Sequence, residues 1–157
     1  MAKMYPHAET RANFKYPLGG LMRLRDFVKD GELRQPTMLD ANGEECLIVV
    51  KNGNSTGVTL GRMPGIKSLT RVYEEGGISL TSMEIAIYPY SHHDGAFSDL
   101  GDSGSVIGDA NSRIVGMLTD GGGLADSTDV TYATPYYFLD KRIKKAFPNS
   151  HLYPIPA

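Results

Sequence analysis

The chain has 157 residues, of which 41% are hydrophobic and 22% charged, and its formal net charge is −2. This composition predicts one globular domain with a hydrophobic core, not a disordered or fibrous protein. Neither a basic stripe nor an apolar run of ~20 residues stands out, so we expect no nucleic acid or membrane partner. The only cysteine, Cys46, cannot form an intrachain disulfide. Together with an N-terminus unlike a signal peptide, it predicts a cytoplasmic location.

The first 44 residues form an arm whose pattern differs from that of the rest of the chain. Leu21, Leu24 and Val28 follow one another at spacings of three and four, which is the spacing of an amphipathic helix. The sequence therefore predicts a helix over 18–30 that ends at Asp30-Gly31. A stripe of this kind usually serves packing, so we expect the arm to lie against the domain that follows.

From Cys46 onward the pattern is that of β-strands. An apolar, β-branched run over 46–51 precedes Asn52-Gly53, which is a typical hairpin turn. Later segments alternate apolar and polar residues, and 66–73 is expected to continue 56–63 as one bent strand. The predicted strands are 46–51, 56–63, 66–73, 80–88, 105–108, 113–119 and 130–134.

A helix is predicted over 136–147, because Pro135 is favourable at a helix start and basic residues lie near its end. The side chains expected to face inward are Phe138, Ile143 and Phe147. Pro148 ends this helix, and 148–157 is expected to be an extended tail. The predicted organisation is therefore an arm with a short helix (1–44), a β-domain with a C-terminal helix (45–147) and a tail (148–157).

The most distinctive motif is Gly101-Asp102-Ser103-Gly104-Ser105, which an apolar run follows at once. Glycines on both sides allow a sharp turn that exposes one hydroxyl. The motif resembles the Gly-Asp-Ser-Gly nucleophile turn of trypsin-like (chymotrypsin-fold) serine proteases. Further segments match that family's C-terminal barrel in the same order: 52–57, 114–118, 119–121 and 132–134. Uncharacterised intracellular fungal proteins carry a similar block.

The resemblance covers 45–147 and implies an all-β fold. That fold is a six- to seven-stranded antiparallel Greek-key barrel like the chymotrypsin C-terminal barrel, with an N-terminal helical arm and a C-terminal helix. It also implies that Ser103 is the nucleophile and that the N–H groups of Gly101 and Ser103 form the oxyanion hole. Thr119, Asp120 and Gly121 would pair with a substrate backbone.

Two further residues of the motif region have alternative interpretations. Phe97, six residues before the serine, falls where the family sets its primary specificity pocket, and packing in the core is at least as well supported. The residue equivalent to Asp102 binds an N-terminus released by cleavage in trypsins. In this chain we expect Asp102 to be a turn former that bonds local backbone N–H groups.

The segment before Cys46 has no room for the second barrel, from which the family takes its catalytic His and Asp. His92-His93-Asp94 could supply a replacement base or a metal-binding pair, but an exposed loop is the stronger interpretation. His7 lies in the arm and His151 in the tail. Cys46, without a partner histidine, is expected to be a core residue. We therefore expect no metal site and no cofactor.

Three functional hypotheses follow. The first is a trypsin-like serine endopeptidase relative that carries Ser103 but has weak or no proteolytic activity as this chain, a pseudoenzyme in the second case. Another is a non-catalytic module that binds an extended peptide or protein along 119–121. The last is a self-associating protein, because a barrel without its mate exposes apolar surface. A homodimer is expected under all three.

Overall fold

The computed structural model describes residues 2–12, 18–73, 79–122 and 129–152. The expectations for 1, 13–17, 74–78, 123–128 and the end of the tail, 153–157, lie outside the described residues. No helix in the described part is long and apolar enough to cross a membrane.

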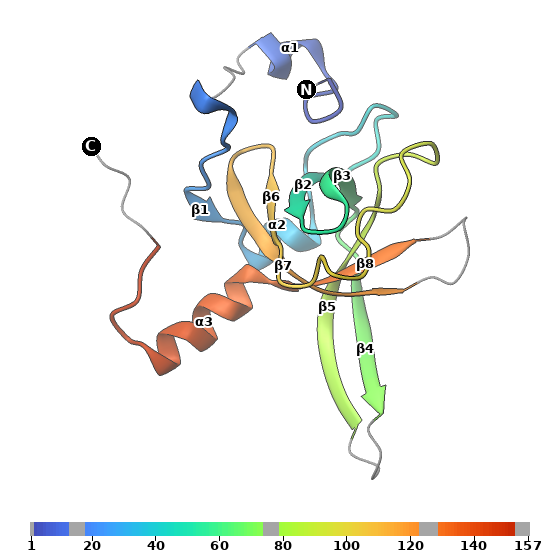
Figure 1. Ribbon diagram of the computed structural model, residues 1–157. Coiled ribbons are helices and arrows are strands. Elements are labelled where there is room, and N and C mark those ends of the chain that lie inside the picture. Colours follow the sequence, from blue (N-terminus) through green and yellow to red (C-terminus); the bar gives the residue numbers. More distant parts are fainter. Residues whose placement is uncertain (1, 13–17, 74–78, 123–128, 153–157) are drawn as a thin grey trace.

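Within the described residues, six antiparallel strands close into a barrel (Figure 1). Going round the ring, these strands are β2 (Leu47–Gly53), β3 (Gly57–Met63), β5 (Ser79–Pro89), β8 (Val130–Pro135), β7 (Arg113–Gly122) and β6 (Val106–Asp109). Each pairs with the next, and β6 pairs with β2 to close the ring. Because β6 returns through a long connection to lie beside β2, the arrangement is a Greek key. The expected fold class is therefore confirmed.

The barrel interior holds the core, whose residues come from every barrel strand and from the arm. Alternation is clear in β8, where Thr131, Ala133 and Pro135 are buried and their neighbours are not. The cluster comprises Val28, Leu33, Leu47, Val49, Met63, Ile85, Ile87, Phe97, Ile107, Val115, Leu118 and Ala133. Apolar side chains at every second position thus converge on one interior, as a small barrel requires.

Two further strands extend the sheet. β4 (Lys67–Tyr73) pairs with the first half of β5, and this hairpin projects beyond the barrel (Figure 1). The one bent strand expected over 56–73 is interrupted at 64–66, so β3 and β4 are separate strands, although both pair with β5. Two-residue β1 (Asp26–Phe27) pairs in parallel with β7.

The first hairpin turns later than the sequence indicated. Asn52 and Gly53 belong to β2, where they pair with Val58 and Gly57 of β3. The turn consists of 54–56. The turn position expected from Asn52-Gly53 was therefore wrong. Residues 55 and 56 form the turn instead, because both are hydrogen-bonded to Asp102.

The helix expected over 18–30 does not form. The arm instead contains α1 (Ala8–Ala12), a 3-10 turn η1 (Leu18–Gly20), β1 and α2 (Asp30–Arg34). Gly19 and Gly20 have φ of 84° and 74°, which a helix cannot accommodate. The Val28 N–H donates to the Ile114 carbonyl, so the sheet takes over the segment. Val28 is buried, but Leu21 is 80% exposed, and the apolar stripe does not face one surface.

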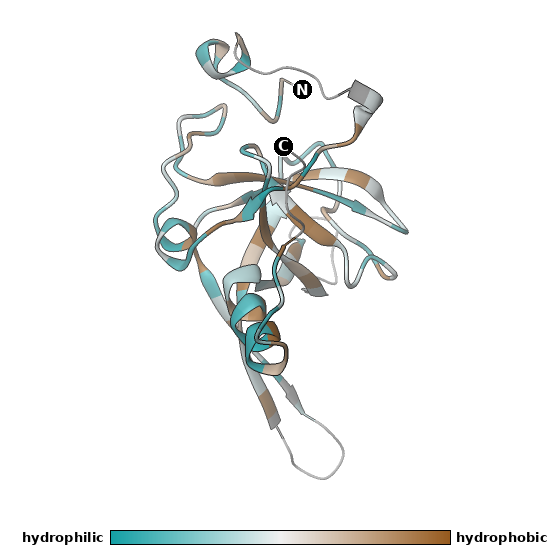
Figure 2. Ribbon diagram, turned by 90° about the vertical axis from the view of Figure 1, so that its left-hand side faces the viewer, coloured by the Kyte–Doolittle hydropathy of each residue, from teal (hydrophilic) through white to brown (hydrophobic). Residues whose placement is uncertain are grey.

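The helix α3 (Tyr136–Ala146) forms as expected, but none of its residues is buried. Phe138, Ile143 and Phe147 are 48%, 40% and 69% exposed, which contradicts the inward orientation expected for them. The first turn is anchored: Tyr137 packs against the core, and the Tyr136 ring lies 5.5 Å from that of Phe27. The rest of α3 runs away from the barrel (Figure 1), and hydrophobic residues occur along its ribbon (Figure 2).

Candidate active site

The serine turn is a tight loop between the connection after β5 and the start of β6. Gly101 and Gly104 adopt left-handed φ values of 95° and 85°, which favour glycine. The Ser105 N–H donates to the Asp102 carbonyl, 3.0 Å away, and the Gly104 N–H donates to the Leu118 carbonyl, 2.8 Å away. Ser103 is exposed. The turn therefore presents one serine to solvent while its backbone is tied to β7.

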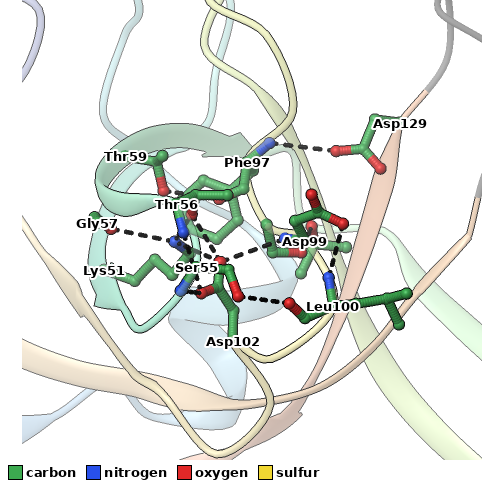
Figure 3. A network of polar contacts seen from close by, with 12 residues as sticks. Lys51, Ser55, Thr56, Gly57, Thr59, Phe97, Asp99, Leu100, Asp102 and Asp129 are labelled. Atoms are coloured by element: carbon green, nitrogen blue, oxygen red, sulfur yellow. Dashed lines mark hydrogen bonds and ion pairs between the residues drawn. The ribbon is translucent and has the colours of Figure 1, made fainter.

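The Asp102 side chain points inward and is enclosed by the β2–β3 hairpin (Figure 3). Its Oδ1 accepts the Ser55 N–H at 2.7 Å, and its Oδ2 accepts the Thr56 hydroxyl at 2.6 Å. Oδ2 also lies 3.0 Å from Nζ of Lys51. The neighbouring Asp99 N–H donates to the same oxygen, at 3.2 Å. Asp102 thus does bond a local N–H, as expected, but most of its partners come from the distant hairpin, which is a correction.

These contacts determine the charge of Asp102. The Thr56 hydroxyl above all, then the Ser55 N–H and the Lys51 ammonium, hold the pKa of Asp102 well below its usual range. Burial acts in the opposite direction but does not prevail. Asp102 is therefore a carboxylate throughout the physiological range.

Lys51 is the residue that sequence reasoning missed. Its side chain is fully buried, and its ammonium lies 5.7 Å from the centre of the Phe97 ring. A signal was present: Leu47, Val49 and Lys51 are at alternate positions of one strand, so the lysine falls on the buried side. A lysine in phase with core residues requires a buried partner.

Two backbone donors in the turn have no acceptor among the described protein residues. Asp102, Gly104 and Ser105 all donate their N–H groups to carbonyls. Within the described part of the chain, the N–H groups of Gly101 and Ser103 donate to no protein atom. These are the two groups that the resemblance assigns to an oxyanion hole.

The strand β7 has an open edge beside the serine. β6 pairs with β7 only as far as Val106 opposite Met117, whereas β8 continues along its other edge to Gly122. Thr119, Asp120 and Gly121 are exposed. The Ser103 hydroxyl donates to the Thr119 carbonyl, 3.4 Å away. The structure thus brings Ser103 and 119–121 together.

Phe97 is 1% exposed and belongs to the core cluster, so packing describes its position. Its N–H donates to Asp129 (Figure 3), and its carbonyl accepts the Thr59 hydroxyl. Burial, more than the nearby charge of Asp99, raises the pKa of Asp129. Ser98 follows, and its Oγ would lie 3.9 Å from a methyl group placed on Gly121. That Phe97 helps to determine substrate specificity stays a prediction.

In the described part of the chain, the four histidines make no hydrogen bond with Ser103. His7, His92, His93 and His151 are all exposed. Asp94, next to His93, pairs with Lys3 of the arm. The described residues hold no group of three His, Cys, Asp or Glu side chains that could bind a metal. Cys46 is 3% exposed, and burial raises its pKa to about 11, so its thiol is protonated and packed in the interior.

No family model matches the chain, and no curated protein does. Among solved structures, chymotrypsin from Cellulomonas bogoriensis matches with 20% sequence identity and a TM-score of 0.43. The match covers 65% of this chain and 47% of that enzyme. The chain thus spans about half the length of that solved structure.

Proposed function

We propose that this chain is a trypsin-like serine protease-related domain. It presents Ser103 as the nucleophile beside a peptide-binding edge formed by 119–121, and it has weak or no proteolytic activity as this chain. The observation that carries the proposal is the contact between the Ser103 hydroxyl and the Thr119 carbonyl. The exposed hydroxyl thus lies at the edge of β7, in the same turn as the N–H groups of Gly101 and Ser103, which have no acceptor among the described residues.

The chemistry follows from these positions. A peptide that adds to β7 as an extra strand would bring a carbonyl carbon to Ser103 Oγ. The Oγ–carbon bond would form as the C=O π electrons move onto the oxygen, and the N–H groups of Gly101 and Ser103 would stabilise this oxyanion. Its collapse would break the C–N bond and release the amine, which takes up the proton lost by Ser103. The proton of Ser103 needs a base, and no histidine contacts it in the described residues. Removal of triad members slows such enzymes by roughly 10⁴- to 10⁶-fold, so low activity is expected.

Fluorophosphonate labelling tests this proposal. We expect slow labelling of the folded protein at one site, its complete loss in Ser103→Ala, and its retention in Ser105→Ala, which alters the neighbouring hydroxyl. Mass spectrometry of the labelled peptide identifies the site. Labelling that persists in Ser103→Ala, or no labelling of folded protein over a day, would refute the assignment of Ser103. If labelling is rapid, His7, His92 and His93 should be replaced in turn to find the base.

A second candidate is a binding module without catalysis, favoured because no histidine among the described residues is hydrogen-bonded to Ser103. Strand addition needs only the open edge of β7 and not a reactive hydroxyl. We expect a pool of end-blocked extended heptapeptides to shift the backbone amide NMR signals of 119–122 equally in parent protein and Ser103→Ala. Amide shifts confined to other strands would contradict binding at this edge.

The compartment also remains a proposal. A cytoplasmic location accords with the single buried thiol, Cys46, since a reducing environment preserves it.

A further inference from the structure

Lys51 and Asp102 form an ion pair that is shielded from water on every side. Both side chains are 0% exposed, and Nζ lies 3.0 Å from Oδ2. Nζ also donates to the Thr56 hydroxyl and to the Gly57 carbonyl, the latter at 3.2 Å. The three donors of the ammonium therefore have three acceptors. This saturation fixes the lysine in a single position (Figure 3).

A buried pair of this kind is poorly explained by stability alone. Two apolar side chains of similar volume often stabilise a core as well as an ion pair does, because both charges must lose their water. Loss of one partner, in contrast, leaves an uncompensated charge inside the protein. The pair therefore fixes a position: because β2 holds Lys51 in place, the Asp102 carboxylate has to lie within ion-pair distance of it.

Asp102 transmits this geometry to the serine turn. It lies between Gly101 and Ser103, its N–H donates to the Asp99 carbonyl, and its own carbonyl accepts the Ser105 N–H. The same carboxylate fixes Asp99 from the other side. With the side chain of Asp102 held inward, the next residue is turned outward, and Ser103 is exposed.

We propose that Lys51 is a positioning residue for Ser103, acting through its buried ion pair with Asp102 to hold 101–105 in the shape that exposes the Ser103 hydroxyl. The positive charge that pairs with Asp102 belongs to Lys51, a buried residue of β2, and not to the amino group of a chain terminus. Reactivity of the positioned hydroxyl rests on the proposed function, whereas the shape of the turn can be measured without it.

The test uses the double variant Lys51→Met/Asp102→Asn, which removes both charges and leaves no unpaired ion. Lys67→Met is the matched control, because Lys67 also pairs with an aspartate, Asp30, at 2.7 Å, and neither residue belongs to the serine turn or to the β2–β3 hairpin. We expect amide hydrogen exchange at Gly104 and Ser105 to be at least tenfold faster in the double variant, with β5 and β8 unchanged. The rate of phosphonate labelling per folded molecule should fall at least tenfold. Lys67→Met should change neither quantity.

The outcomes separate the two proposals. Faster turn exchange with slower labelling supports both. Faster turn exchange in a protein whose parent form never labels refutes Ser103 as a nucleophile and supports the positioning role. Unchanged exchange in the folded double variant overturns the positioning role, whatever the labelling. If the double variant does not fold, Thr56→Val carries the same exchange measurement, because it removes the hydroxyl shared by both charges.

Discussion

Gly53 lies where β2 passes closest to the Asp102 carboxylate. A Cβ on Gly53 would be 2.3 Å from Oδ1 of Asp102 and 2.4 Å from its Cγ. Contacts this short cannot be relieved by a flexible chain end, because both oxygens of the carboxylate are held by the hairpin and by Lys51. Absence of a side chain at Gly53 is therefore a condition for the buried network.

We expect Gly53→Ala to lower the free energy of unfolding by about 1–3 kcal/mol, the usual cost of overpacking a core. Gly31→Ala is the control, since a Cβ at Gly31 would meet nothing within 4 Å, and surface changes usually stay within ~0.5 kcal/mol. Urea denaturation of both variants measures the difference. If Gly53→Ala proved as stable as Gly31→Ala, the Asp102 network would accommodate an added methyl group, which would contradict its fixed geometry.

Much of the residue-level site could be inferred from sequence, and some could not. Ser103, Gly101 and Gly104 stand in a motif whose glycines are a local signal for the turn. The evidence for Lys51 in the sequence is weaker: it lies at alternate positions with Leu47 and Val49, on the buried side of the same strand. Its pairing with Asp102 could not be read from the chain, because Lys51 lies on β2 and Asp102 in the turn before β6, and the two meet only once the barrel closes.

At the scale of elements, a polar cluster fastens the arm and α3 to β4. Lys67 on β4 lies 2.7 Å from Asp30 of α2 and donates to the Tyr137 hydroxyl of α3, 3.0 Å away. The Lys67 hydrogen bond is the largest of several contacts that lower the pKa of Asp30 to about 2. The Lys67 ammonium thus joins three elements that are far apart in sequence: an ion pair links it to α2, and a hydrogen bond links it to α3.

The lowered pKa of Asp30 makes this cluster pH-dependent. A carboxylate with a lower pKa in the folded than in the unfolded state stabilises the fold above the unfolded value of about 4, and this contribution is lost as the pH falls through about 2. Since Asp30 is partly exposed, solvent screens the pair, and we expect Asp30→Asn to cost less than ~1 kcal/mol at pH 6. Near pH 2 the difference from the parent protein should vanish.

Urea denaturation of parent protein and Asp30→Asn at pH 6, 3 and 2 measures this dependence. Asp140→Asn is the control, because Asp140 pairs only within α3, with Lys144. A difference between parent and Asp30→Asn that persists undiminished at pH 2 would mean that Asp30 acts through packing and not through charge.

Element prediction succeeded where periodicity was strong and failed in the arm. Alternation predicted the bounds of β5 and β8 closely. Burial alternates in β8, but in β5 residues 84–87 are all buried and Met83 is 56% exposed. The stripe at Leu21, Leu24 and Val28 predicted a helix, but two left-handed glycines and pairing with β7 outweighed it. A three-residue stripe is a weak signal, since contacts with a distant strand can override local propensity.

At the scale of the whole molecule, α3 presents an apolar surface to solvent. Phe138, Ile143 and Phe147 are 40–69% exposed, and Arg142 lies over the Phe138 ring. Exposed apolar area of this kind favours association. The homodimer expected from the sequence therefore remains a proposal, with α3 as the surface that supports it.

Sedimentation velocity over a hundredfold concentration range tests self-association. We expect the mean mass to rise toward that of a dimer in the parent protein and to fall at least partly to the monomer in Phe147→Lys. Leu69→Lys is the matched control, because Leu69 is 63% exposed on the projecting β4–β5 hairpin. Dissociation by Leu69→Lys alone would move the interface to the hairpin, and a monomer at every concentration would refute the dimer.

The amino-acid sequence alone determined the all-β class, the principal strands, the serine turn and the existence of α3. Alternation of apolar and polar residues, glycines in turns and a proline at the start of a helix act over a few residues, so they can be recognised in a short stretch of sequence. The closure of β6 on β2, the buried partners of Asp102 and the outward course of α3 were decided by tertiary structure. Each depends on which distant segments meet, and that choice is made by the packing of the whole core, which no short stretch of sequence records.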